Sequence, residues 1–142
     1  MGLNTLKSVF RPRWSLLALG GLLGVLVVTH IPQEYMPRTP QGGYFDKIEH
    51  TLAYGGITLL FMLSLKWPAR AGALVLVLLG LAFIGVLDEV TQPWVNRIAS
   101  TGDYLADLVG IVVVAVVFLL GKRCRRQAGS QTSSTPVSGK LG

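Results

Sequence analysis

Four apolar stretches alternate with short polar segments along this chain. A helix that crosses a membrane needs about 20 residues, and three of the four stretches reach this length only when polar residues at one end are included. The sequence therefore predicts an all-α protein, a four-helix bundle that spans a membrane. The apolar stretches cover residues 14–31, 48–65, 71–87 and 104–121.

The polar residues that complete these spans carry nearly all of the carboxylates. Because successive spans run in opposite directions, the ends that carry them meet on one side of the membrane. We therefore expect these residues just inside one edge of the bilayer, with His30 and Glu34 on the same side. They are Asp46, Glu49, His50, Asp88, Glu89, Asp103 and Asp107.

The lysines and arginines predict the orientation of the bundle. Ten of the 13 lie in the N-terminal segment, the loop between spans two and three, and the C-terminal tail, whereas Arg38, Lys47 and Arg97 lie on the acidic side. Basic residues stay in the cytoplasm, so both termini are predicted to be cytoplasmic and the acidic side extracytoplasmic. The net charge of +6 thus reflects topology, and no nucleic-acid partner is expected.

Composition agrees with a membrane protein. The chain has 142 residues, 51% of them hydrophobic, and a mean hydropathy of +0.54, which is too apolar for a soluble domain of this size. We divide it into a basic leader (1–13), a membrane domain (14–121) and a basic, disordered tail (122–142). No small-residue cleavage site follows the first stretch, which we interpret as an uncleaved anchor. The single Cys124 is expected to be a reduced thiol.

Span two begins with a polar stripe, because Asp46, His50 and Tyr54 recur every four residues and share a helix face. Asp46 suits a helix cap, with Glu49 three residues later completing a box-like pattern. His50 and Tyr54 should face the bundle interior. There His50 is either a hydrogen-bonded core residue or a ligand and proton carrier.

Span three ends with Asp88 and Glu89, where the helix dipole disfavours carboxylates by roughly 0.3–1 kcal/mol each. Gln92 follows Glu89 on the same face, and Arg97 is the natural counter-charge. Glu89 is therefore either half of a structural pair with Arg97 or a functional carboxylate.

Before span four, Ser100 and Asp103 match a capping box. Asp103 and Asp107, four residues apart, repel each other, so either one is protonated or both share a cation or an arginine. Paired carboxylates with a histidine suit a divalent metal, although the spacing matches no specific metal motif and predicts no particular cofactor. Close helix packing is expected at Gly80, Gly85 and Gly110.

Read in order, these residues resemble the VanZ-like family of small bacterial membrane proteins. The resemblance covers residues 45–120 and rests on Asp46-Lys47-x-x-His50-x-x-x-Tyr54, Glu89-x-x-Gln92, Arg97-x-x-Ser100-x-x-Asp103 and Gly110. The family's usual asparagine is replaced here by Asp107. The resemblance implies the bacterial cytoplasmic (inner) membrane and a link to the cell envelope, since the family is named for a protein connected with teicoplanin resistance. It implies no reaction.

Two functions compete. The first is a site at the outer leaflet that binds or processes an envelope lipid or lipid-linked precursor, with Arg97 and Lys47 holding an anionic head group and Glu89 and His50 as the acid–base pair. The second is a non-enzymatic accessory protein that acts on an envelope enzyme through helix contacts. A transporter is disfavoured because no ionisable residue marks the middle or inner half of the spans. The sequence does not predict the oligomeric state.

Overall fold

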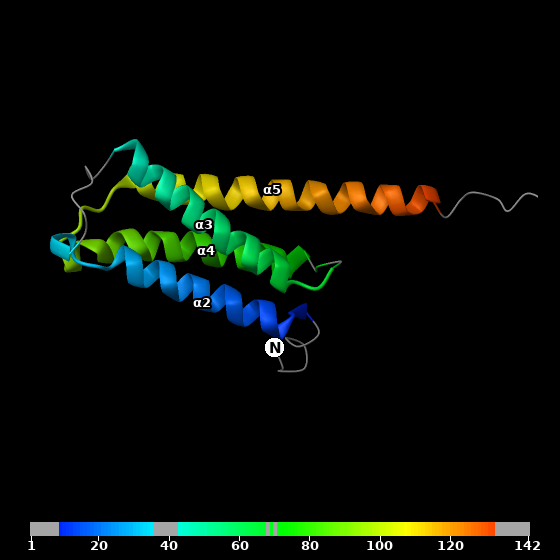
Figure 1. Cartoon of the computed structure of the whole chain (residues 1–142), viewed down its shortest axis with the longest axis horizontal. Coiled ribbons are helices and arrows are strands. Elements are labelled where there is room, and N and C mark those ends of the chain that lie inside the picture. Colours follow the sequence, from blue (N-terminus) through cyan, green and yellow to red (C-terminus); the bar gives the residue numbers. More distant parts are fainter. Residues whose placement is uncertain (1–8, 36–42, 68, 70, 133–142) are drawn as a thin grey trace, which may run out of the picture.

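The computed structural model describes residues 9–35, 43–67, 69 and 71–132. Within them lie four α-helices, which confirms the all-α prediction, and successive helices run side by side in opposite directions (Figure 1). Two short 3-10 helices, η1 and η2, follow α2 and α4. The bounds are α2 Pro12–Thr29, η1 Gln33–Tyr35, α3 Tyr44–Ser64, α4 Ala71–Thr91, η2 Gln92–Val95 and α5 Thr101–Thr132.

Three helical segments are long and apolar enough to cross a membrane, namely Pro12–Thr29, Ala71–Val95 and Thr101–Gln127. Helix α3 does not meet this criterion because its first two turns carry Asp46, Lys47, Glu49 and His50. Large apolar side chains are nonetheless exposed on every helix of the bundle, as expected of a surface that faces lipid. The described residues thus support a multi-pass membrane protein.

Helix α3 packs mainly against α5 and also contacts α2 and α4. The approach to α5 depends on glycine: a Cβ on Gly110 would collide with the backbone oxygen of Thr51 and would lie 3.0 Å from the Gly55 nitrogen. Gly85 also faces a neighbour, since its Cβ would lie 3.4 Å from Asp107 Oδ2. Close packing is therefore confirmed at Gly85 and Gly110. At Gly80 the prediction is wrong, because a Cβ there would meet no atom within 4 Å.

The chain ends depart from the expected boundaries. Helix α5 continues past Gly121 to Thr132, so residues 122–132 are helical where we predicted disorder. The cause is the run of lysine, arginine, glutamine and alanine, which are strong helix formers. At the other end Val9 is buried, and its carbonyl accepts a hydrogen bond from the Lys66 N–H (2.8 Å). Three segments lie outside the described residues, namely 1–8 of the predicted leader, 36–42 of the first loop and 133–142 of the tail.

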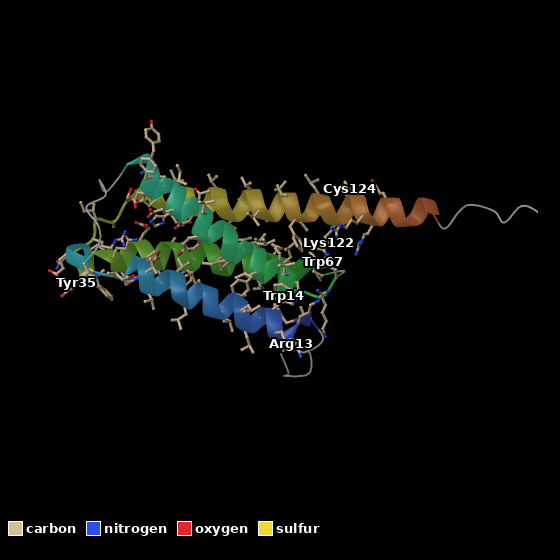
Figure 2. The ribbon with its side chains drawn as sticks, in the orientation of Figure 1. Arg13, Trp14, Tyr35, Trp67, Lys122 and Cys124 are labelled. Carbon is tan, nitrogen blue, oxygen red and sulfur yellow. The ribbon has the colours of Figure 1, made fainter. Side chains whose placement is uncertain are left out.

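The two ends of the bundle differ in charge. Arg13, Trp14, Trp67 and Lys122 gather at one end, and Tyr35 lies at the opposite end (Figure 2). Trp67 packs against Phe118 with ring centroids 5.7 Å apart, and the Lys122 ammonium lies over both rings. The acidic residues occupy the end near Tyr35, where α3 and α5 begin and α2 and α4 end (Figure 1).

Candidate functional site

A buried histidine–aspartate pair joins α3 to α5. His50 Nδ1 lies 2.9 Å from Asp107 Oδ1, and the two side chains are 6% and 0% exposed. The contact is possible because the backbones of α3 and α5 approach closely at Gly110, one turn beyond Asp107. The second oxygen, Asp107 Oδ2, is also buried and has no hydrogen-bond partner among the described residues.

Glu89 binds the start of the next helix. Its Oε2 accepts a hydrogen bond from the Ser100 backbone N–H (2.8 Å), and its Oε1 accepts one from Gln92 Nε2 (3.3 Å). The structural Glu89–Arg97 pair, one of the two roles that the sequence left open for Glu89, is not formed, since none of the ion pairs among the described residues joins these side chains. Glu89 lies in the last turn of α4, which disfavours its charge, but it also caps the N-terminus of α5, where a negative charge is favourable.

The predicted capping box at α5 is not formed, because the Asp103 N–H bonds to the Ser100 carbonyl and not to its hydroxyl. Ser100 directly precedes the helix, and its carbonyl accepts the Asp103 N–H (2.9 Å). In a complete box the third helical residue would return a bond to the Ser100 N–H, but Glu89 occupies that N–H. Asp103 instead accepts a hydrogen bond from Lys47 Nζ at 3.1 Å.

Asp103 and Asp107 thus have separate basic partners on α3. Lys47 pairs with Asp103, and His50 pairs with Asp107. A shared arginine is not needed to relieve their repulsion. The Lys47 side chain is 37% exposed whereas that of Asp103 is 4% exposed, so this pair reaches the surface while the His50–Asp107 pair does not.

Asp46 is not the cap of α3. The helix begins two residues earlier, at Tyr44, with Gly43 as the N-cap and no side-chain hydrogen bond at the cap. Asp46 lies within the first turn, where its charge still suits the helix dipole. Its carboxylate approaches His50 and Asp103, and donor atoms of all three residues lie within 4.8 Å of one another.

A second group shares the same histidine. Donor atoms of His50, Glu89 and Asp107 also lie within 4.8 Å of one another, and all three residues are buried. The predicted convergence of polar residues from α3, α4 and α5 at one end of the bundle is therefore confirmed. We call the residues His50, Glu89, Asp103 and Asp107, together with Asp46, the polar cluster.

Tyr54 lies one helical turn below His50 and is fully buried. Its hydroxyl has no hydrogen-bond partner among the described residues, although Asp88, Asp107 and Glu89 all lie within electrostatic reach. Asp88 Oδ2 is likewise buried and unpartnered. These two groups are natural partners for each other after a small side-chain rotation.

A cavity of about 410 Å³ opens beside the polar cluster. One part of its wall is apolar and comes from Gly21, Gly24, Val25 and Val28 of α2; the other part is polar. Arg97 lines the cavity, and its Nε atom is buried without a hydrogen-bond partner among the described residues. The remaining lining residues are Thr29, Asp46, Glu49, His50, Ala53 and Tyr54.

Two smaller openings reach other members of the cluster. A cavity of about 170 Å³ is lined by Asp46, Gln92, Arg97, Ser100 and Asp103, with Ile98 and Ala99. A third cavity, of about 340 Å³, lies on the α4–α5 side and includes Glu89 and Tyr104. Every residue that we predicted for the site except Lys47 lines one of these cavities or belongs to the polar cluster.

The structure also places His30 beside Asp88, a contact that we did not predict. Asp88 Oδ1 accepts a hydrogen bond from Thr29 Oγ1 (2.6 Å) and lies 3.4 Å from His30 Nδ1. The other ring nitrogen of His30 lies 2.8 Å from Thr91 Oγ1. This group joins the end of α2 to the end of α4. The available signal was polar residues at the ends of two apolar stretches.

Comparison with known proteins yields no match to a family model, to a curated protein or to a solved structure. The VanZ-like resemblance therefore rests on the residues that carry it.

Proposed function

We propose that this chain is a VanZ-like multi-pass protein of the bacterial cytoplasmic membrane that binds an anionic amphiphile of the cell envelope. The observation that carries the proposal is the cavity of about 410 Å³, which joins an apolar wall on α2 to His50 and Arg97. An amphiphile needs both surfaces in one site, since its chain requires apolar contacts and its head group requires charge and hydrogen bonds.

In this proposal all four helices lie in the membrane. Helix α3 is as long as α4 and runs alongside its neighbours (Figure 1). Its polar residues His50, Tyr54 and Thr58 are buried, whereas Ile48, Leu52 and Leu59 are exposed. That distribution suits a helix with a polar interior face and a lipid-facing apolar side. With both termini in the cytoplasm, the polar cluster and its cavities lie at the outer leaflet.

Arg97 is the residue best placed to hold the head group. A guanidinium recognises phosphate or carboxylate through charge-assisted hydrogen bonds, and the Arg97 Nε is buried at the cavity with no hydrogen-bond partner in the described part of the chain. Lys47, which the sequence also suggested for this role, is engaged by Asp103. A phosphate-bearing envelope lipid or lipid-linked precursor fits this charge.

His50 and Glu89 supply the groups that would act on a bound ligand. In the neutral ring, a proton shared between Nδ1 and Asp107 leaves Nε2 as the basic nitrogen. Glu89 lies within the same group of donor atoms. The two residues can exchange a proton with a ligand or fix the polarity of the cavity, and the first role would make the protein an enzyme.

The test is complementation of a deletion strain, with envelope lipids analysed by mass spectrometry and teicoplanin susceptibility measured in parallel. Strains that carry Arg97→Gln or His50→Ala are expected to accumulate the same lipid intermediate as the deletion strain. The variant proteins should remain in the membrane at normal abundance. Glu34→Gln is the matched control, because Glu34 is an exposed acid of η1 on the same side. It is expected to complement fully.

The alternative function gives the opposite pattern. If an accessory protein acts through helix contacts, substitutions at exposed apolar positions such as Leu76 and Leu79 of α4 abolish complementation. Changes at His50 and Arg97 are then tolerated. That result would overturn the binding proposal.

A further inference from the structure

We infer that His50, Glu89 and Asp107 form a binding site for a divalent transition-metal ion, with Zn²⁺ as the preferred occupant. The inference does not rest on the proposed amphiphile. The three residues come from α3, α4 and α5, and one donor atom from each lies within 4.8 Å of the other two.

These separations are close to those of a ligand set. Bonds from Zn²⁺ to histidine nitrogen or carboxylate oxygen are about 2.0–2.2 Å long, which places donors of one ion roughly 3–4 Å apart. His50 Nδ1 and Asp107 Oδ1, at 2.9 Å, already meet this requirement. Small side-chain movements bring Glu89 to the same distance, because among the described residues its carboxylate is held only by the Ser100 N–H and Gln92.

An independent observation points to a cation at Asp107. Its Oδ2 atom is buried, has no hydrogen-bond partner among the described residues, and belongs to a side chain that is 0% exposed. An unpaired carboxylate oxygen in such a place is unfavourable unless a cation or donor meets it. Gly85 leaves room beside that oxygen, since even an added Cβ would remain 3.4 Å away.

The surrounding charges also favour a cation. Four carboxylates are buried at this end of the bundle, on Asp88, Glu89, Asp103 and Asp107. Among the described residues, Lys47 is the only lysine or arginine that forms an ion pair with one of these carboxylates, and its partner is Asp103. His30 lies beside Asp88. Glu89 and Asp107 are left with His50, which carries at most one positive charge.

The donor set indicates the class of metal. Imidazole favours zinc, iron, nickel and copper, whereas sites built only from carboxylates favour magnesium and calcium. One imidazole and two carboxylates equal the open zinc sites in number of protein ligands, and such three-ligand sites leave a further position for water or a ligand. Binding at His50 Nδ1 would displace the proton shared with Asp107, so metal uptake should release protons.

A path to the site exists on both sides. His50 lines the cavity of about 410 Å³, and Glu89 lines the cavity of about 340 Å³ on the α4–α5 side. An ion can therefore reach the cluster without unfolding of the bundle.

The experiment uses the full chain, without a histidine tag, purified in lipid nanodiscs and stripped with a chelator. It is dialysed against Zn²⁺, Mn²⁺ or Mg²⁺, and bound metal is measured by mass spectrometry. Stoichiometric Zn²⁺ uptake is expected, with proton release detected by calorimetry in buffers of different ionisation enthalpy. Absence of tight uptake of any of these ions would overturn the inference, and preference for Mg²⁺ would overturn the assigned metal class.

Asp107→Asn is the decisive variant. Its amide oxygen can still accept the His50 hydrogen bond, so the fold should be kept, which circular dichroism and size exclusion will check. Loss of a negatively charged ligand should weaken Zn²⁺ binding by at least the roughly 10–100-fold that loss of an outer-shell partner costs. Asp88→Asn is the matched control, because it is an equally buried aspartate held by Thr29 and His30, and it should bind Zn²⁺ as the wild type does.

Two further outcomes would reject the inference. Unchanged Zn²⁺ affinity in a folded Asp107→Asn variant means that the ion binds elsewhere. Loss of binding in Asp103→Asn with retention in Glu89→Gln would move the site to the Asp46, His50 and Asp103 group. If the protein binds no metal but the lipid phenotype is as expected, the metal site is rejected and the proposed function is retained. If the protein binds Zn²⁺ as expected but the lipid phenotype is absent, the proposed function is rejected and the metal site is retained.

Discussion

Replacing Gly110 with alanine tests whether the contact between α3 and α5 positions the polar cluster. The new Cβ would overlap the Thr51 carbonyl oxygen, and it would lie 3.0 Å from the Gly55 nitrogen and 3.1 Å from the Thr51 carbonyl carbon. These are backbone atoms, which no side-chain rotation can move away. Ordinary contacts of carbon require about 3.5–4.0 Å, so α3 and α5 must separate by roughly 1 Å at this point.

The expected loss of stability follows from two opposing terms. Overpacking of a close contact costs about 1–3 kcal/mol, and a backbone collision belongs at the upper end of that range. Alanine recovers about 1 kcal/mol over glycine inside a helix. The net destabilisation is therefore about 2 kcal/mol, or roughly a 30-fold fall in the ratio of folded to unfolded protein.

The assay is reversible unfolding in mixed detergent micelles, with Gly80→Ala and Gly56→Ala as controls. A Cβ at either control position meets no atom within 4 Å, so both variants should be as stable as the wild type or slightly more so. Separation of the helices should also lengthen the His50–Asp107 contact one turn away, which weakens function in the complementation assay. If Gly110→Ala is as stable as Gly80→Ala, the close approach of α3 and α5 is wrong.

Three other predictions follow from the charged groups. Lys47→Met should destabilise the protein by about 1–3 kcal/mol, because it leaves the buried Asp103 charge unpaired, and adding Asp103→Asn should recover most of the loss in the same unfolding assay. His30→Ala should increase protease sensitivity at the end of α2, because it removes the contacts to Asp88 and Thr91, and unchanged digestion would argue against that contact. Reporter fusions should be active in the periplasm at Gly42 and in the cytoplasm at the C-terminus, and a cytoplasmic signal at Gly42 would refute the proposed topology.

The helices were predictable because hydropathy is a local property of the sequence. An apolar stretch of about 20 residues predicts its own helix, and a histidine or carboxylate at its edge must turn inward to find partners. This reasoning correctly brought His50, Glu89 and Asp103 together. The individual partners were not predictable: Arg97 was one candidate partner for Glu89, and the structure provides the Ser100 N–H instead.

The missing information is helix rotation and register. One residue of shift turns a helical side chain by about 100°, which is enough to exchange one partner for another. Here the register of α3 against α5 depends on the contact between Gly110 and the backbone at Thr51 and Gly55. The small residue at position 110 predicted close packing at Gly110, but it did not show which helix would approach. The pairing of Lys47 with Asp103 could therefore not be inferred.

The helix dipoles explain why these acids are tolerated at one end of the bundle. Asp46 and Asp103 lie in the first turns of α3 and α5, where negative charge is favoured. Glu89 lies in the last turn of α4, but it accepts a hydrogen bond from the N–H of Ser100, which directly precedes α5.

Asp107 differs from the other acids because it lies a full turn deeper than Asp103 and gains least from the N-terminus of α5. One of its oxygens bonds to His50 and the other is buried without a partner. A fold that needed only a hydrogen bond to His50 would be served by asparagine, whose amide oxygen accepts the same bond. The carboxylate adds a buried negative charge and no further hydrogen bond within the described residues. Burial of this charge costs free energy unless a counter-charge compensates it. A bound cation would supply that counter-charge.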